Sequence, residues 1–474
     1  MKKSLIVVLS LFFVLGLAVP VVVHAADETP AVAKGDTKIT LGGKIRIRGD
    51  FRTNMDFNED LGDNNSTYET GIWLKLNVKV SPNTEGMVEF RDTKTSGDDD
   101  STWGSTGGDA KGLYTRGGNV SGFTDARYTQ FTQAWIQHKG SGLLGIPAGI
   151  KIGHMPMKLG NGLFYDHTKS GEDGFILSAD PTKELGLALM YAKLYEGTAT
   201  SNDDFNLYSL VFNYKPAKDI NLSADLSYLD DQKGTVNSAG TVSTAPTVTS
   251  NKGVHIWNLG LRGNANVSGF GIKADVEIQG GKSKGLADYD PVTAGSQAGD
   301  VKFKGYAVLI GADYKLDPVT LGLEYAYGSG DSNSTDNRYK GFVNILDNKP
   351  KTTFIYEYRV VQPVANGTTG SQMGLNNTQY IKVSAAGTLA KDLKGRLSIY
   401  RLRANKVEGF TYNDKEIGWE IDPYIEYQID KNLKYFIEGG YLFAGDFYKN
   451  VSTVPSGQDP DNAYEIRHGL LLTF

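Results

Sequence analysis

The stretch KITLGGKIRIRGDFR, residues 38–52, alternates apolar and polar side chains along its length. Its apolar set comprises Ile39, Leu41, Ile45, Ile47 and Phe51, and its basic set comprises Lys38, Lys44, Arg46, Arg48 and Arg52. A period of two predicts a β-strand with one apolar face and one cationic face, because a helix would scatter these residues around its axis. A strand of a soluble β-sandwich, with its basic face in water, would show the same pattern.

The N-terminus has the pattern of a secretion signal. Lys2 and Lys3 precede an apolar run that ends at VHA, residues 23–25. We predict a signal peptide over residues 1–25 with cleavage after Ala25, and the length of the apolar run leaves an uncleaved membrane anchor as the alternative. The chain contains no cysteine, which excludes a disulfide framework and a lipidated N-terminal cysteine.

The composition of the chain indicates a large all-β protein of a bacterial envelope. The chain has 57 glycines and 26 tyrosines, and its 54 acidic residues outnumber its 49 basic ones. The net negative charge argues against a nucleic-acid partner. After the N-terminal segment, no stretch reaches the roughly 18 consecutive apolar residues of a membrane helix. We expect residues 26–36 to be a short linker, with no further domain boundary after it.

A hairpin unit recurs along the chain. Its copies are NYKPAKDINLSADLSY (213–228), DYKLDPVTLGLEYAYG (313–328) and EYQIDKNLKYFIEGGY (426–441). Each copy ends one strand at tyrosine, turns through lysine, aspartate or proline, and begins a second alternating strand.

The connections between these hairpins are long and rich in Gly, Ser, Asn and Asp, at 95–123, 230–252, 281–300, 328–376 and 446–462. A soluble sandwich has no reason to keep its short turns at one end. Short turns that alternate with long loops therefore predict a transmembrane, antiparallel, up-and-down β-barrel with short periplasmic turns and long extracellular loops. Lipid would contact its apolar face, and water would fill its interior.

We predict eighteen strands, an even number that places both chain ends on the periplasmic side. They are 37–54, 68–80, 86–94, 126–138, 148–154, 174–179, 184–195, 206–214, 219–229, 253–263, 270–280, 301–314, 319–328, 378–389, 396–404, 416–429, 433–445 and 463–474. The weakest of these are 148–154, 174–179 and 396–404. If two of the three are loops, the barrel has sixteen strands.

The final strand carries the most specific motif. YEIRHGLLLTF, residues 464–474, alternates apolar and polar residues and ends at Phe474. It resembles the C-terminal signal that the barrel-assembly machinery of the outer membrane reads. The mature chain as a whole resembles a bacterial outer-membrane porin of the general diffusion type. Within barrels, IKIGHMPMKLGNGLFYD (150–166) resembles the glycine-rich segments of alginate-export and related substrate-specific porins.

This resemblance implies a location in the bacterial outer membrane, contact with its lipid and lipopolysaccharide, a homotrimer, and a third external loop that folds into the barrel. By the strand count that loop is 155–173, where Leu159, Leu163 and Phe164 favour inward packing over an ordinary solvated loop. The constriction-loop candidates are Lys158, Asp166, His167, Lys169, Glu172 and Asp173.

In the porin arrangement such a loop faces a basic wall across the channel. The candidate pore-lining cations are Lys44, Arg46, Arg48, Arg52, Arg91 and Arg127. A second acidic patch in the lumen is expected from Glu416, Glu420, Asp422 and Glu426. Rings of charge of this kind determine which ions pass a pore, although these residues could also be merely solvated by the lumen.

No chemistry of an enzyme is evident. No HxxxH or HExxH pair occurs, and the GxSxG match at residues 281–285 (GKSKG) stands where a predicted strand runs into a long loop rather than a helix. We therefore expect no catalytic site, no metal and no cofactor. The leading hypothesis is a passive diffusion channel for ions and small hydrophilic solutes. Its alternatives are a substrate-specific channel for a sugar, an oxyanion or an anionic polymer, and a non-conducting structural or adhesive barrel. A barrel enzyme is a further alternative.

Overall fold

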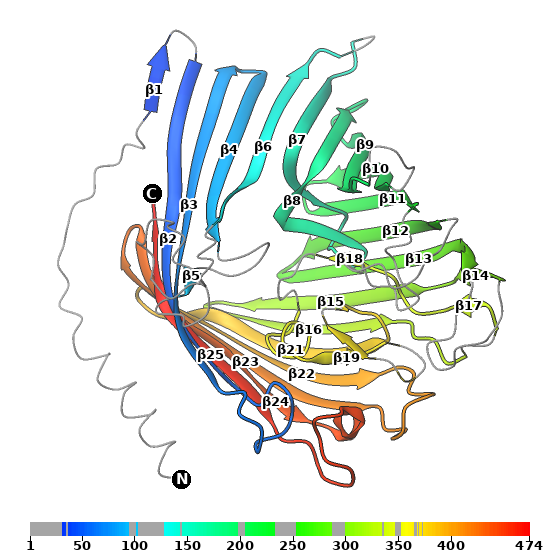
Figure 1. The fold of residues 1–474 in the computed structure, drawn as a ribbon. Helices are drawn as coiled ribbons and strands as arrows, with labels where there is room; N and C mark the ends of the chain where they lie inside the picture. The colour runs from blue at the N-terminus through cyan, green and yellow to red at the C-terminus, as the bar shows by residue number, and fades with distance from the viewer. Residues whose placement is uncertain are drawn as a thin grey trace, which may run out of the picture.

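A computed structural model describes residues 31–34, 37–93, 101–102, 128–142, 145–197, 204–232, 253–286, 299–333, 336–346, 352–364, 367, 369–371 and 373–474. The predicted signal peptide lies outside these residues, as does Arg127. The described chain forms one closed antiparallel barrel (Figure 1). No helix in the described part of the chain is long and apolar enough to cross a membrane.

Eighteen strands make the barrel wall, and each pairs with its neighbours in antiparallel register. They are β2 (Thr37–Thr53), β3 (Asn65–Ser81), β4 (Thr84–Thr93), β6 (Tyr128–Gly140), β7 (Ala148–Lys158), β8 (Tyr165–Ala179), β9 (Leu185–Tyr195), β10 (Phe205–Ala217), β11 (Ile220–Asp231), β12 (Val254–Val267), β13 (Phe270–Leu286), β15 (Tyr306–Leu316), β16 (Val319–Gly328), β21 (Thr378–Ala390), β22 (Leu393–Ala404), β23 (Glu416–Asp430), β24 (Leu433–Ala444) and β25 (Ala463–Thr473). The barrel closes where β2 pairs with β25, from Lys44 opposite Thr473 to Thr53 opposite Tyr464. The prediction of eighteen strands is confirmed, and the sixteen-strand alternative is wrong.

Short elements decorate this wall. They are β1 (Ala31–Lys34), β5 (Ser101–Thr102), β14 (Gly299–Phe303), β17 (Arg338–Tyr339), β18 (Ile345–Leu346), β19 (Val361–Pro363), β20 (Thr369–Ser371) and the 3₁₀ helix η1 (Asp446–Asn450). β1 pairs with β2, so part of the expected linker is in fact a strand.

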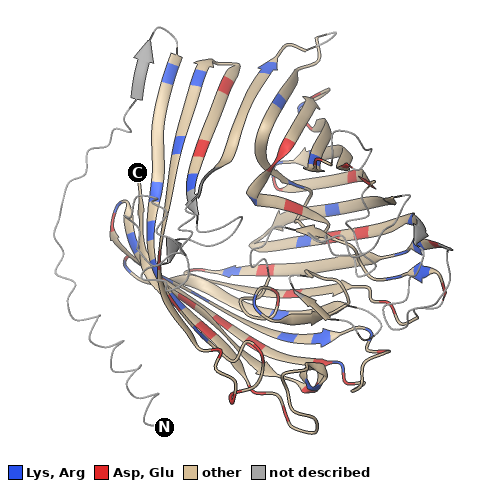
Figure 2. Ribbon diagram, viewed as in Figure 1, with Lys and Arg blue, Asp and Glu red and all other residues tan. Residues whose placement is uncertain are grey.

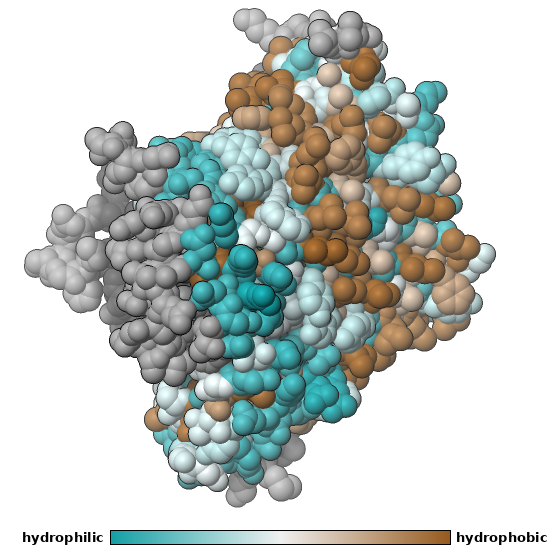
Figure 3. Space-filling view, turned by 90° about the vertical axis from the view of Figure 1, so that its right-hand side faces the viewer, coloured by the Kyte–Doolittle hydropathy of each residue, from teal (hydrophilic) through white to brown (hydrophobic). Residues whose placement is uncertain are grey.

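The two faces of the wall have opposite character. In β2, Leu41 and Ile47 are 37% and 38% exposed on the outside, whereas Arg48 is only 6% exposed on the inside. Figure 3 shows a band of hydrophobic side chains across the outer surface, with hydrophilic residues beside it. The apolar side of each strand therefore faces lipid, and a one-residue slip of β2 would move cations into the bilayer at roughly 2–4 kcal/mol each near its midplane.

The connection between β16 and β21 runs inside the barrel. It carries fully buried apolar side chains, among them Tyr339, Phe342, Val343, Ile345 and Ile355. Ile345 on β18 pairs in parallel register with β8, and the Val343 backbone exchanges hydrogen bonds of 2.8 and 2.9 Å with the Gln279 side chain on β13. We call residues 329–377 the inner loop. The sequence predicts a long external loop here, whereas the structure places described parts of it, among them Val343, Ile345 and Ile355, against the inner wall.

Candidate functional site

A cluster of cations surrounds one tryptophan on the inner wall. Lys44 on β2, Trp73 on β3 and Arg91 on β4 stand side by side in register. The Lys44 Nζ atom lies 4.1 Å from the centre of the indole, and the guanidinium carbons of Arg46 and Arg91 lie at 5.3 and 5.1 Å. We call Lys44, Arg46, Trp73 and Arg91 the cation cluster. Three of the six predicted wall cations thus converge.

The indole offsets part of the repulsion between these cations. A cation near the face of a tryptophan is stabilised by about 0.5–2 kcal/mol, depending on how dry the site is. Glu89 on β4 pairs with Lys75 at 2.8 Å and accepts a hydrogen bond of 2.7 Å from the Thr132 hydroxyl. Figure 2 shows the resulting run of basic residues along β2 and β3. A concentrated positive potential on a lumen wall attracts anions.

The other predicted wall cations have different surroundings. Arg48 lies deeper than Arg46 and pairs with Glu69, with an Nε–Oε2 distance of 3.0 Å. This buried pair is electrically neutral, so Arg48 contributes little to the wall potential. Arg52 stands near the outer end of β2 and is partly exposed.

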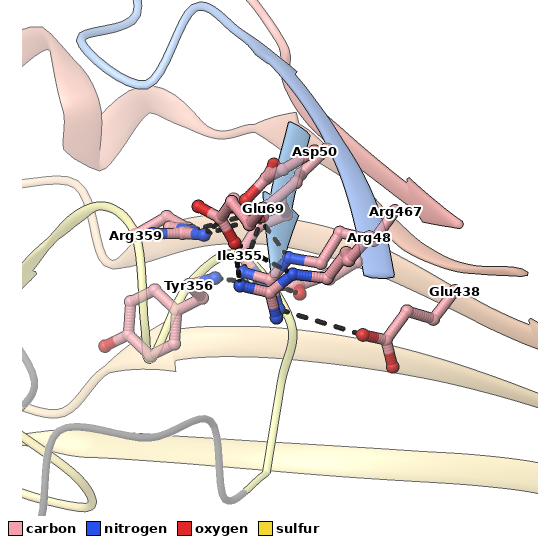
Figure 4. A network of polar contacts seen from close by, with 10 residues as sticks. Arg48, Asp50, Glu69, Ile355, Tyr356, Arg359, Glu438 and Arg467 are labelled. Carbon is pink, nitrogen blue, oxygen red and sulfur yellow. Dashed lines mark hydrogen bonds and ion pairs between the residues drawn. The ribbon is translucent and has the colours of Figure 1, made fainter. Parts of the chain in front are cut away.

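A second group of charges ties the inner loop to the wall (Figure 4). Arg359 of the loop binds Glu465 on β25 through two hydrogen bonds of 2.7 Å and lies 3.2 Å from Asp50 on β2. Arg467 on β25 bridges the same two carboxylates, at 3.3 Å to Asp50 and 2.6 Å to Glu465. Its guanidinium also lies 3.8 Å from Glu438 on β24. These side chains, apart from Glu438, are almost fully buried, so the network serves as an anchor.

Two residues of the predicted acidic patch hold the same loop. Glu420 accepts hydrogen bonds from the backbone N–H groups of Ile355 and Tyr356, and Asp422 accepts one from Phe354 at 3.1 Å. Carboxylates that accept several backbone N–H bonds fix a turn firmly, because charge-assisted hydrogen bonds are strong. Glu420 and Asp422 therefore anchor the inner loop from β23.

The other two acidic candidates lie apart from this turn. Glu426 pairs with Lys434 at 2.7 Å on the inner wall. Glu416 instead contacts Arg401 and Arg403 on the outer surface, so its prediction as a lumen residue is wrong. β23 has a bulge, because Leu402 pairs with Gly418 whereas the next residue, Arg403, pairs with Glu416. The extra residue in β23 shifts the alternation, so that Glu416 faces outward.

The predicted third loop is mostly strand. Residues 155–158 end β7, residues 165–173 begin β8, and only 159–164 form the turn. This turn nevertheless bends into the lumen, where Asn161 donates two hydrogen bonds to Asp275 on β13, of 3.3 and 3.0 Å. Phe164 is fully buried, and its carbonyl accepts a hydrogen bond from Ile345 of the inner loop.

The six charged candidates of that segment do not form one group. Lys158 and Asp166 stand opposite each other in the two strands, and Asp166 binds Thr168. His167 pairs with Glu172. Asp173 pairs with His154 at 3.0 Å and is 78% exposed on the outer face. Lys169 lies in β8 between these pairs.

The sequence did not predict the cluster of charges around Arg262, which contacts the turn 159–164. Arg262 on β12 is buried and forms ion pairs with Asp225, Asp275 and Glu277 on the two neighbouring strands. Gly160 in the turn packs on the Arg262 side chain so closely that a Cβ there would overlap it. The alternation of apolar and polar residues predicts that these charged side chains face inward. Their proximity depends on the register between β11, β12 and β13, which the sequence alone does not give.

The turn 159–164 and the described residues of the inner loop thus form a partition across the lumen. It begins at Arg262 and Asp275, passes from Phe164 to Ile345, and ends at Glu420, Asp50 and Glu465. Segments that cross the lumen in this way reduce the space that is open to solutes. The cation cluster lies on β2, β3 and β4 of the wall.

Comparisons with known proteins agree with this architecture. A protein-family model described as alginate export matches residues 37–458. No curated protein sequence matches the chain. Three solved structures from Pseudomonas aeruginosa share the fold, each at 11% identity and covering 92% of this chain: OccK8 (OprE), with a TM-score of 0.52 and 98% of its own chain covered, OprD, with 0.51 and 95%, and OpdK, solved with vanillate, with 0.50 and 98%. At this identity the likeness shows the fold alone.

Proposed function

This chain belongs to the alginate-export family and forms an outer-membrane channel, and on that premise we propose that the channel is specific for anionic solutes, in particular uronate oligomers. The proposal favours the substrate-specific alternative over general diffusion. The observation that carries it is the cation cluster, where Lys44, Arg46 and Arg91 surround Trp73 on the inner wall.

The chemistry of the cluster suits an acidic sugar. Guanidinium and ammonium groups bind carboxylates by charge-assisted hydrogen bonds, and a positive lumen raises the local concentration of anions. The partition supports specificity, because the inner loop fills lumen space in addition to the turn 159–164, which corresponds to the inward-folding loop expected of a general diffusion porin. Family membership supports an anionic polymer, since alginate is built from uronic acids.

Planar-bilayer recording tests this proposal. We expect anion-selective reversal potentials in a salt gradient, and block of the current by a uronate oligomer but not by a neutral oligosaccharide of equal length. The Lys44→Gln/Arg46→Gln variant should shift the reversal potential towards cations and weaken the block about tenfold. Lys282→Gln is the matched control, because Lys282 pairs with Asp300 on the outer surface.

The possible outcomes separate the functions considered. Equal passage of both oligomers without block would support general diffusion and overturn the proposal. Absence of any current would support a structural or adhesive barrel. An unchanged reversal potential in the Lys44→Gln/Arg46→Gln variant would remove the cation cluster from the selective site.

A further inference from the structure

The outer surface of the barrel carries a pair of arginines at the outer end of β22, beside β23. We propose that Arg401 and Arg403, beside Trp419, bind a phosphate group of an outer-leaflet lipid of the lipopolysaccharide type. We call these three residues the outer arginine patch. The proposal concerns the lipid-facing surface and is independent of what passes through the lumen.

The register places both arginines on the lipid-facing side. Arg401 stands opposite Ile381 on β21 and Trp419 on β23, which are 50% and 49% exposed. Arg403 stands opposite Gln379 and Glu416, one two-residue step further along the strand. The two guanidinium side chains are 48% and 46% exposed. They are therefore accessible from the surface that lipid surrounds.

Their height matches that of a lipid headgroup. Trp419 stands opposite Phe443 on β24, and both rings face outward. Aromatic side chains of transmembrane barrels form girdles at the membrane interfaces. Arg401 lies level with this girdle, with its guanidinium carbon 5.8 Å from the Trp419 ring. Arg403 lies about 7 Å nearer the loops, by the rise of two strand residues, where the phosphates of the outer leaflet are expected.

The patch has an excess of positive charge. Glu416 accepts hydrogen bonds of 3.3 and 3.2 Å from Arg401 and lies 3.5 Å from Arg403. One carboxylate therefore faces two guanidinium groups, while the preceding Asp414 and Lys415 cancel in formal charge. An excess of one positive charge is what a lipid phosphate would complement, and a planar guanidinium offers it paired donors.

The other charged pairs at this level of the described wall differ from the patch. In each of them every cationic or titratable nitrogen side chain has its own carboxylate: His154 with Asp173, Lys193 with Asp204, His255 with Asp230 and Lys282 with Asp300. In the outer arginine patch, by contrast, two guanidinium groups share one carboxylate. A soluble phosphate would meet this patch only in bulk water, whereas a headgroup is held beside it by the bilayer, so we assign the lipid as the occupant.

Native mass spectrometry of the detergent-solubilised full chain tests the assignment. The probe is purified bisphosphorylated lipid A, compared with the same lipid after removal of its phosphates and with inorganic phosphate as a competitor. We expect the Arg401→Gln/Arg403→Gln variant to bind the bisphosphorylated lipid about tenfold more weakly. Glu416→Gln should bind it several-fold more tightly, because a competing carboxylate is lost. Lys282→Gln is the control and should bind like the parent.

Three results would overturn the assignment. They are equal binding of the phosphorylated and dephosphorylated lipid, displacement of the lipid by millimolar inorganic phosphate, and unchanged binding by both the double variant and Glu416→Gln. Heat-modifiable electrophoretic migration checks that each variant is folded. If the double variant fails that check, the affinity of Glu416→Gln decides the question. Conductance should stay as in the parent, which separates this test from that of the proposed function.

Discussion

Arg359 of the inner loop donates two hydrogen bonds, each of 2.7 Å, to the carboxylate of Glu465 on the last strand. The two residues are 106 positions apart in the chain. Both side chains are nearly inaccessible to solvent, so their charges depend on one another. The position of the loop in the lumen is therefore coupled to the strand that closes the barrel.

Replacing Arg359 should weaken the attachment of the inner loop to the barrel wall. Truncation of one member of a buried ion pair costs about 3–5 kcal/mol, because the other charge is left uncompensated. We expect Arg359→Gln to raise single-channel conductance and open-channel noise in planar bilayers. Arg338→Gln is the matched control, since Arg338 lies on the same loop but is exposed. Identical conductance and noise in Arg359→Gln and the parent would contradict an anchoring role.

The pair formed by Arg48 and Glu69 should matter for stability. Both side chains are buried, and the Arg48 Nε–Glu69 Oε2 distance is 3.0 Å. We expect Arg48→Gln and Glu69→Gln each to lower the thermal unfolding midpoint, because each removes one member of a buried ion pair. The double variant should recover much of the loss, which a double-mutant cycle by circular dichroism measures. Additive losses would show that the two side chains act independently.

Gly160 should be intolerant of any side chain. Its φ is +51°, a left-handed conformation that glycine adopts readily, and a Cβ would overlap the Arg262 side chain. We expect Gly160→Ala to displace the turn 159–164 from the wall and to alter conductance, while the barrel still folds. Gly145→Ala is a control for the backbone effect, because its φ is also positive and no atom lies near its added Cβ. Equal conductance in the two variants would argue against a fixed turn.

Alternation along the strands was enough to predict the barrel but not the position of every charge. The period of two in β2 correctly separates Leu41 and Ile47 from Arg48. Which arginine of β2 stands opposite Glu69 depends on the register between β2 and β3, and pairing across strands is a tertiary property. Only the structure therefore shows that Arg48 faces Glu69.

Local irregularities account for the errors in the candidate site. The bulge at Gly418, with φ of +134°, moves Glu416 to the outer face, and a single sequence does not mark a bulge reliably. The sequence predicts that the glycines at 160 and 162 belong to a long loop, yet they form only a tight turn between two extended strands. The inner loop did carry a signal, since Phe342, Val343 and Ile355 are apolar residues that a solvated loop would not need.

Asp331 at the start of the inner loop should make barrel stability depend on pH. Its side chain is fully buried, Oδ1 accepts a hydrogen bond from the Asn333 N–H at 3.3 Å, and Oδ2 has no hydrogen-bond partner. The pKa of this carboxyl is raised to about 6, mainly by burial. The negative charge of Asp336 also raises the pKa, whereas the positive charge of Lys340 lowers it. The folded state therefore holds the proton more tightly than the unfolded chain, whose aspartate pKa is about 3.9.

The direction of the effect follows from this difference in pKa. Stability should fall as pH rises from about 4 to 6, where the unfolded chain releases the proton first, and should level off above that range. Asp331→Asn carries no titrating proton, so this variant should match the parent near pH 4 and unfold at a higher temperature at pH 7. Thermal unfolding between pH 4 and 8, with Asp336→Asn as the control for a neighbouring carboxylate paired with Lys340, measures the difference. Parallel pH profiles for the parent and Asp331→Asn would show that Asp331 is not the titrating group.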